Sequence, residues 1–333
     1  MSSLLKPSIS IVIPVHNGGS NFRRCLESIA AALPPPQETI VVADGDTDGS
    51  WHVAKEFGAL VLRTPTPGGP ARARNMGAHR AKSDILFFVD ADVTIPQDAV
   101  SRVAAAFQYD PDLAAVFGSY DEEPFQTNFL SQYKNLFHHY VHQTAREEAS
   151  TFWGACGGIR REVFFAMSGF DEWYRRPSIE DIELGSRLKK AGYKIRLLKG
   201  LQVKHLKRWT ISSLLKADFF CRALPWTSLI IKEGRFINDL NLKISNRLSV
   251  ISVYMLLLTS CGALYIPWLF AAVVFFILML IALNLNLYRF FHHKRGLKFA
   301  IKTIPWHWFY FFYSGMAFAI GFGKYRIMKS GSS

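Results

Sequence analysis

The chain has 333 residues, of which 50% are hydrophobic and 20% charged, and its formal net charge is +13. This length allows roughly two structural units of about 150 residues, and the apolar content excludes a disordered or collagen-like chain. The excess charge lies near the C-terminus: the last acidic residue is Asp239, and from Arg247 onward there are nine Lys or Arg residues between apolar segments. Basic residues are placed in this way beside membrane spans, whereas a nucleic-acid-binding protein would place them on a folded polar face.

The first apolar stretch of the chain, residues 9–15, is too short for the hydrophobic region of a signal peptide. We therefore expect the N-terminal part to stay in the cytosol. The four cysteines lack metal-finger or CxxC spacing, and we expect them to be buried thiols and not a disulfide framework.

Three short, β-branched apolar segments predict strands, at residues 9–15, 40–43 and 85–89. The segments between them contain apolar residues at helical spacing. Alternation of strands and helices predicts an α/β fold with a mostly parallel sheet flanked by helices. In such a sheet, ligands bind at the carboxyl ends of the strands.

Polar turns follow all three predicted strands, at residues 14–18, 44–50 and 90–92. A single acid-rich turn is usually a solvated loop, but three at one sheet edge indicate a ligand site. Neither the G-x-G-x-x-G fingerprint nor a P-loop is present, which argues against a nicotinamide-dependent oxidoreductase and a P-loop NTPase. Asp90 and Asp92 instead offer oxygen ligands for Mg²⁺ or Mn²⁺ on a diphosphate.

Over about residues 8–209 the chain resembles the family 2 glycosyltransferases of GT-A fold. The segments that support this resemblance are IVIPVHN, IVVADGDTDGS, ARNMGAHRAKSDILFFVDAD, GFDE, EDIELGSRLKKAGYKI and HLKRW. The resemblance implies a nucleotide-sugar-binding domain, with a UDP-sugar favoured, and an inverting single-displacement transfer that uses Mg²⁺ or Mn²⁺.

The same resemblance implies roles for individual residues. Donor-binding residues are Pro14, His16, Asp44, Arg74, Asp90, Ala91 and Trp209, the last also stacking under the acceptor. Metal ligands are Asp92 and, as a second candidate, His205. Catalytic residues are Asp181 as general base, its neighbour Glu180, and Arg208, which neutralises the leaving diphosphate.

A role for Asp181 can also be argued from chemistry. Attack by a hydroxyl requires a carboxylate within hydrogen-bond reach of its proton. Glu180 and Asp181 precede apolar residues at helical spacing, so they are expected at a helix N-terminus, where the dipole favours an ionised base. The alternative is that the two acids only cap the helix.

Three positions depart from the family pattern. Ala43 stands at the first Asp of the usual D-D-G-S turn, and Asp46 stands at its Ser. His205 occupies the Gln position of the Q-x-x-R-W signature of processive synthases, which weakens a processive interpretation. As an alternative to metal ligation, His205 is a packed or hydrogen-bonded histidine. A retained base favours a hydroxyl acceptor over a polyprenyl phosphate, although a polyprenyl-phosphate glycosyltransferase and a non-catalytic assembly subunit remain alternatives.

Two further segments of the catalytic region were considered for site roles. His138, His139 and His142 lack a nearby paired acid, so we predict an aromatic helix facing the acceptor or the membrane and not a metal site. The glycine-rich residues 153–158 are expected to form a floor near the donor sugar.

Apolar residues mixed with basic ones at residues 209–245 predict helices in the lipid interface, or an amphipathic helix that covers the core. Residues 248–288 contain no charge and predict a hairpin of two membrane helices turning near Pro267, the alternative being one long kinked helix. A basic loop at 289–303 is expected in the cytosol, followed by an aromatic-rich third span at 304–323.

These segments define the expected organisation: a GT-A catalytic domain at 1–208, interfacial helices at 209–245 and a transmembrane region at 246–333. Two or three spans are possible and we expect three. The protein is expected to be an integral membrane protein with a cytosolic catalytic domain, at the inner membrane if bacterial, acting on a lipid or lipid-linked acceptor and binding no nucleic acid.

Overall fold

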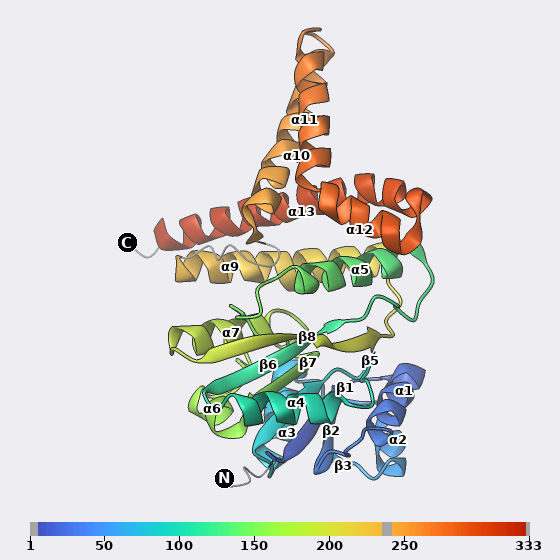
Figure 1. Cartoon of the computed structure of the whole chain (residues 1–333). Helices are drawn as coiled ribbons and strands as arrows, with labels where there is room; N and C mark the ends of the chain where they lie inside the picture. Colours follow the sequence, from blue (N-terminus) through green and yellow to red (C-terminus); the bar gives the residue numbers. More distant parts are fainter. Residues whose placement is uncertain (1–5, 235–241, 331–333) are drawn as a thin grey trace. The chain divides into compact units, whose positions relative to one another are not determined.

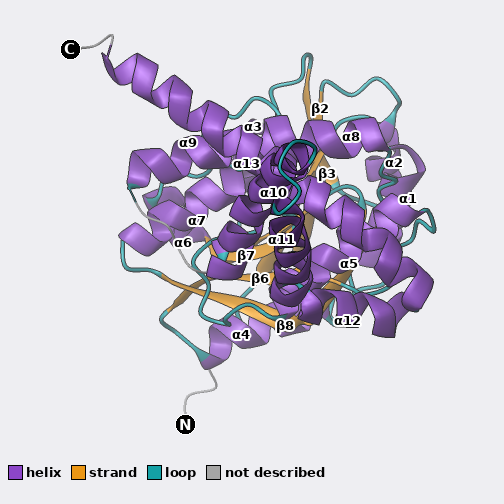
Figure 2. Ribbon diagram, turned by 90° about the horizontal axis from the view of Figure 1, so that it is seen from above, coloured by secondary structure: helices purple, strands orange, loops and turns teal. Residues whose placement is uncertain are grey.

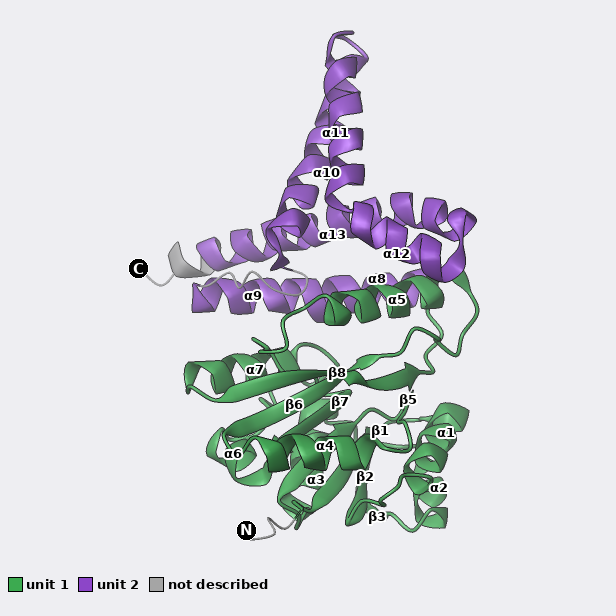
Figure 3. Ribbon diagram, viewed as in Figure 1, with its two compact units in different colours: residues 1–209 green, residues 210–333 purple. Residues whose placement is uncertain are grey.

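The computed structural model describes residues 6–234 and 242–330. The chain divides into two compact units, residues 1–209 and 210–333, which Figure 3 shows in different colours. The sheet belongs to the first unit, and all described elements of the second unit are helical.

An eight-stranded sheet forms the centre of the first unit, in the order β3-β2-β1-β4-β7-β6-β8-β5 (Figure 1). The strands are β1 (Ile9–Val15), β2 (Glu38–Asp44), β3 (Leu60–Thr64), β4 (Ile85–Val89), β5 (Val93–Thr94), β6 (Leu113–Tyr120), β7 (Cys156–Arg160) and β8 (Lys194–His205). β7 is antiparallel to both of its neighbours, β4 and β6, and β5 is antiparallel to β8. The other pairs are parallel.

Seven helices accompany this sheet in the described part of the first unit. They are α1 (Gly19–Ala30), α2 (Ser50–Glu56), α3 (Pro70–Arg80), α4 (Ala99–Tyr109), α5 (Phe129–Gln143), α6 (Arg161–Ala166) and α7 (Glu180–Lys190). α1 is amphipathic and buries Phe22, Cys25, Leu26 and Ile29 at helical spacing. α3 packs closely on the sheet because Gly77 faces Val12, where an added Cβ would lie 2.4 Å from a valine methyl carbon.

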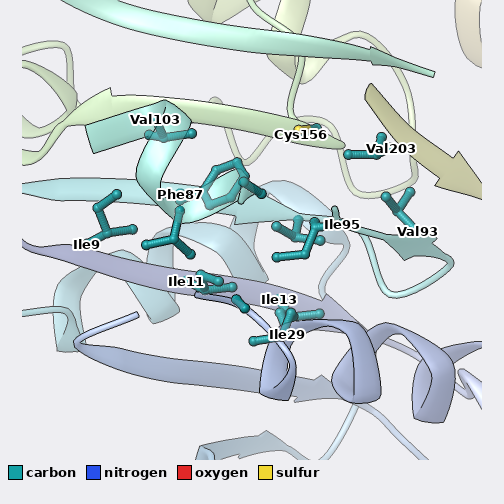
Figure 4. Close-up of a cluster of buried hydrophobic side chains, with 14 of the residues drawn as sticks. Ile9, Ile11, Ile13, Ile29, Phe87, Val93, Ile95, Val103, Cys156 and Val203 are labelled. Carbon is teal, nitrogen blue, oxygen red and sulfur yellow. The ribbon is translucent and has the colours of Figure 1, made fainter. Parts of the chain in front are cut away.

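The β-branched and aromatic residues of the central strands form the core. Figure 4 shows Ile9, Ile11 and Ile13 of β1 together with Phe87 of β4 and Ile29 of α1. Strands that are buried on both faces are continuous hydrophobic segments, as β4 (ILFFV) is. Packing of this kind fixes the strand ends that form the site.

The structure confirms the α/β fold with a mostly parallel sheet flanked by helices. The strands expected at 9–15, 40–43 and 85–89 are present as β1, β2 and β4. The sequence analysis missed β3, an edge strand that is mostly half-exposed. Because β1 lies between β2 and β4, the three predicted polar turns are neighbours.

The second unit consists of α8 (Ile211–Leu215), the π-helix η1 (Lys216–Ala223), α9 (Leu224–Glu233), α10 (Ile244–Ala263), α11 (Leu269–Leu283), α12 (Leu285–Arg295) and α13 (Leu297–Ser330). α10 and α11 pack together as a hairpin whose turn contains Pro267, so the hairpin is confirmed. Part of the expected interfacial segment, residues 235–241, lies outside the described residues.

The basic segment at residues 289–303 is not an irregular loop, and its expected position in the cytosol stays a prediction. This segment is helical, since it comprises the end of α12 and the start of α13, with only Gly296 between them at a φ of 81°. Lys and Arg are good helix formers, so a basic segment without proline need not be a loop.

By length and composition, α10 could cross a membrane, and α11 with α12 could do so as a pair, although that pair is bent by 62°. α13 is not among the described helices that meet this criterion. Figure 2, turned by 90° from Figure 1, shows the hairpin end-on, with α12 and α13 extending away from it.

Candidate active site

The loops after β1, β2 and β4 lie at one edge of the sheet. After β1, the side chain of Asn17 accepts hydrogen bonds from the backbone N–H groups of Thr47 and Asp48, at 2.8 and 3.2 Å. His16 is exposed, and its Nδ1 lies 2.7 Å from the carbonyl oxygen of Asp44. These bonds tie the first two predicted turns into one structure.

Asp44 is buried at the end of β2. Its carboxylate accepts hydrogen bonds from the backbone N–H groups of Gly68 and Gly69, at 2.8 to 2.9 Å, and from the Thr64 hydroxyl at 2.8 Å. Gly69 has a φ of 95° and lies against the backbone of Arg175, so a side chain there would clash. Asp44 therefore organises the loop that leads into α3.

Arg74 connects the DxD turn with the acidic pair of α7. Its Nη2 donates to Asp90 Oδ1 at 2.6 Å and its Nη1 donates to Glu180 Oε1 at 2.9 Å. The Arg74 and Glu180 side chains are each 5% exposed, whereas that of Asp90 is 32% exposed. Removing either carboxylate would leave Arg74 partly unpaired in a buried position, which is strongly destabilising.

Asp181 lies beside this ion-pair network, in the first turn of α7. Its Oδ2 accepts a hydrogen bond from Gly154 N at 2.9 Å, and its Oδ1 accepts one from Ile182 N at 2.8 Å. Burial, and then the neighbouring charge of Glu180, raise the pKa of Asp181 to about 6. A carboxylate with such a pKa is mostly ionised at pH 7 and still basic enough to accept a proton.

The pKa of Asp92 is shifted in the opposite direction to that of Asp181. Its carboxylate is 32% exposed, and its Oδ2 lies 3.7 Å from Nε2 of His205. Burial alone would raise the pKa of Asp92, but the His205 side chain and the charge of Lys207 lower it to about 2. The residue is therefore an ionised oxygen ligand throughout the physiological range.

His205 ends β8 and is held in place from two sides. Its ring stacks on Tyr120 with centroids 4.4 Å apart, and Val93, next to Asp92, pairs with it in the sheet. The pairing of β5 with β8 thus brings His205 to the DxD turn.

The remaining predicted residues differ in exposure. Pro14 and Ala91 are half-buried, and Arg208 is exposed. Trp209 is only 4% exposed; its backbone N–H donates to the Ser131 hydroxyl at 2.8 Å, and Lys207 lies over its ring.

The α5 histidines belong to an aromatic cluster. His138 and His142 contact each other and Trp153, while His139 Nδ1 lies 2.7 Å from the carbonyl oxygen of Tyr120. Burial lowers the pKa of His142 to about 4, so it is neutral at pH 7.

Sequence reasoning assigned no role to several residues that support the site. Asn75 is bonded to both backbone groups of Phe170 and to Glu172, which fixes the GFDE turn against α3. Its place in the ARN motif was the available signal. Tyr120 and Thr64 carry no such signal, because their roles arise from strand pairing.

The residues at the DxD turn suit a divalent cation in part. Asp92 supplies an ionised, partly exposed oxygen, and His205 supplies a nitrogen beside it. Among the described residues, no group of three His, Cys, Asp or Glu side chains is placed to hold a metal alone. A cation here would need ligands from the diphosphate itself.

Part of the chain matches the model of a known protein family. The model of glycosyl transferase family 2 matches residues 10–165, which contain the strand-end turns, Arg74 and the DxD motif. Residues 10–165, a little under half of the chain, are therefore similar to glycosyl transferase family 2.

Relatives cover parts of the chain. The succinoglycan biosynthesis protein ExoA of Rhizobium meliloti is 31% identical over 209 residues, 58% of this chain and 61% of that protein. Glycosyltransferase GlyA of Streptococcus pneumoniae is 33% identical over 116 residues, 33% of this chain and 17% of that protein. The chain therefore spans less than two thirds of either relative.

A solved structure shares the fold over a longer region. The mannosyltransferase PcManGT of Pyrobaculum calidifontis, in complex with GDP-Man and Mn²⁺, has a TM-score of 0.57 at 16% identity. The alignment covers 95% of this chain and 87% of that one, so the shared fold includes helices beyond the sheet domain.

Proposed function

We propose that this protein is a family 2 glycosyltransferase that moves a sugar from a nucleotide-sugar donor to a hydroxyl of a membrane-associated lipid or saccharide acceptor, with inversion. The observation that best supports this is the position of Asp181: a carboxylate with a pKa of about 6, adjoining the ion pairs that Arg74 makes with Glu180 and Asp90. As the acceptor oxygen attacks the anomeric carbon and the bond to the diphosphate breaks, Asp181 accepts the hydroxyl proton.

The donor would bind at the carboxyl ends of β1, β2 and β4. Asp92, with His205, is the residue that would hold Mg²⁺ or Mn²⁺, and such a cation when bound neutralises charge that develops on the leaving diphosphate. The exposed Arg208 is assigned to the same task from the protein side. The complex of PcManGT with GDP-Man and Mn²⁺ supports this class of ligands; a UDP-sugar is our preferred donor.

Glu180 has a supporting role in this proposal. Its carboxylate is engaged by Arg74 and by the backbone N–H of Ser178, at 2.9 Å each. It therefore orients Arg74 and, through its charge, raises the pKa of Asp181.

We further propose that the second unit anchors the protein in a membrane through the α10–α11 hairpin, with the catalytic unit on the cytosolic side. Between Leu248 and Tyr288 there is no charged residue. Large apolar side chains along the hairpin are exposed, among them Leu258 at 67% and Phe275 at 58%. Exposed apolar surface of this extent marks a membrane or protein contact.

A hydrolysis screen tests the donor site without knowledge of the acceptor. Purified protein in detergent should slowly hydrolyse one of a panel of UDP-, GDP- and dTDP-sugars, and only with Mg²⁺ or Mn²⁺ present. Asp92→Ala should abolish cation-dependent donor binding measured by calorimetry, because it removes the ionised oxygen ligand.

Asp98→Ala is the matched control, since Asp98 is a half-exposed carboxylate of the same unit that pairs with Arg102. It should bind donor like the wild type. Donor binding that persists in EDTA would show that Asp92 holds no metal, and hydrolysis of none of the donors would count against the proposed activity.

A further inference from the structure

α13 contacts the α10–α11 hairpin at one end of the hairpin, opposite its turn, and also packs against α9, η1 and α12. The Tyr254 hydroxyl donates to the carbonyl of Phe312 at 2.8 Å, and Gly315 faces Val250 and Tyr254 so closely that a Cβ would overlap them. Phe311 completes a small buried cluster with Val253 and Leu280. These partners all belong to the start of α10 or the end of α11.

The rest of the hairpin is uncovered. Side chains beyond this cluster are strongly exposed, including Leu258 at 67%, Leu264 at 82% and Phe270 at 66%. A third span running parallel to α10 and α11 would be expected to pack along their length. Figures 1 and 2 instead show α13 running across the hairpin base.

Two features direct α12 and α13 away from the hairpin axis. The break between α11 and α12 is bent by 62° and is stabilised by Asn284, whose side chain donates to Ser249 Oγ at 3.0 Å and to the Leu280 carbonyl at 2.9 Å. The Tyr313 hydroxyl donates to Asp218 of η1 at 2.9 Å. These bonds hold the crosswise arrangement within the second unit.

α13 has one buried face and one exposed face on which apolar and basic side chains are mixed. One face is buried by Ala300, Thr303, His307 and Phe311, at spacings of three and four residues. The opposite face exposes Ile301, Pro305, Phe309, Met316 and Ile320, together with Lys298 and Lys302. Basic residues beside an exposed apolar stripe are typical of helices that lie in the interface of an anionic membrane.

The charge of the whole segment is one-sided. From Arg247 onward the sequence contains nine Lys or Arg residues and no acid. Exposed on α12 and α13 are Arg289, Lys298, Lys302, Lys324 and Arg326. Each basic side chain near an anionic leaflet attracts it electrostatically.

We propose that α10 and α11 alone enter the bilayer, and that α12 and α13 lie along the headgroups of the leaflet on the catalytic side, where their basic residues bind anionic phospholipids. This inference rests on the proposed membrane anchor and replaces the expected third span. It places residues 289–303 and Lys324 on the same side as the catalytic unit.

Cysteine labelling tests the topology. On a Cys221→Ser/Cys261→Ser background, Lys298→Cys and Lys324→Cys are treated with a membrane-impermeant maleimide in sealed vesicles of both orientations, with Lys82→Cys of the catalytic unit as reference. Both positions should be labelled in the same vesicles as Lys82→Cys. If Lys324→Cys is labelled only in vesicles of the other orientation, a third span is present and the proposal is overturned.

Lysine footprinting of the unmodified chain tests the lipid. In nanodiscs that contain phosphatidylglycerol, acetylation of Lys298 and Lys302 relative to Lys82 should be about fivefold slower than in pure phosphatidylcholine. High salt should remove the difference by screening. Equal rates in the two lipids would overturn the binding of anionic headgroups.

A charge-reversed variant provides the matched comparison. Arg289→Glu/Lys298→Glu/Lys302→Glu should lose the effect of phosphatidylglycerol on the acetylation of Lys324 relative to Lys82. The control Lys6→Glu/Lys55→Glu/Arg80→Glu has the same change in net charge and should retain this effect. Release of the wild type by alkaline carbonate would instead refute the membrane anchor itself, so the two failures are distinguishable.

Discussion

Asp92, which follows β4, and Asp181, in the first turn of α7, are both carboxylates but lie in different environments. Asp92 has a pKa of about 2 beside His205 and Lys207, while Asp181 has one of about 6 because of burial and the charge of Glu180. Environments that separate pKa values in this way identify which group stays ionised and which one exchanges a proton. These environments agree with the proposed roles, in which Asp92 holds a cation and Asp181 accepts a proton.

Asp181→Asn tests the base. The amide retains the size and most hydrogen bonds of the carboxylate but cannot take a proton, so transfer should fall by about 10² to 10⁴-fold. Donor affinity should change little, since the proposal assigns the diphosphate to Asp92 and Arg208. Transfer rates with a known acceptor and donor calorimetry measure the two effects.

The pH profile supplies a second readout for the same residue. A base works only when deprotonated, so the wild-type rate should be full above the pKa of about 6 and fall about tenfold per pH unit below it. Asp181→Asn should lack this acidic limb. Near-wild-type transfer by the variant would favour the polyprenyl-phosphate alternative, in which an ionised phosphate attacks and has no proton to lose.

At the scale of elements, α7 is placed by its contact with residues 151–154. Gly185 faces the backbone of Thr151 and Phe152, and an added Cβ would lie 2.2 Å from Phe152 N. The same segment supplies Gly154 N, which donates to Asp181. The close approach of this helix therefore positions the base.

Gly185→Ala should force α7 and this segment apart. Overpacking of this kind costs about 1–3 kcal/mol, so the melting temperature should fall by several degrees and transfer should decrease. In Gly200→Ala, the matched control, the added Cβ meets only the end of the Arg102 side chain. Differential scanning fluorimetry measures the melting temperatures. Equal values for the two variants would show that the contact of Gly185 with residues 151–152 is not tight.

Elements that bury a continuous apolar segment could be predicted from the sequence, as β1 and β4 show. β3 (LVLRT) could not, because an edge strand with exposed Leu60 and Arg63 lacks that pattern. The helical structure of residues 289–303 was also missed, since basic residues suit helices and loops alike.

Prediction of the site had a similar limit. The residue types at the strand ends indicated carboxylates close together, but strand pairing and loop packing determine their partners. The contacts of Asp44 with Gly68 and Gly69, and of Arg74 with Glu180, join residues 24 to 106 positions apart. No local pattern in the sequence encodes these pairs.

At the scale of the whole molecule, the proposal assigns chemistry to the first unit and membrane anchoring to the second. The proposed donor residues and Asp181 all belong to residues 1–209, and the exposed apolar hairpin belongs to residues 210–333. Changes in the hairpin should therefore weaken membrane association without altering slow donor hydrolysis in detergent.

Leu258→Asp tests this division. An acid in the middle of a membrane helix costs about 2.5–3.5 kcal/mol, so the insertion equilibrium should shift by roughly a hundredfold and carbonate should release more protein. Leu33→Asp is the matched control, because Leu33 is 62% exposed against 67% for Leu258 but lies in the catalytic unit. It should remain in the membrane, and both variants should hydrolyse donor like the wild type. If the membrane retains the two variants equally after carbonate extraction, the hairpin is not the anchor. An acid placed in lipid costs more free energy than an acid at a position that already faces water.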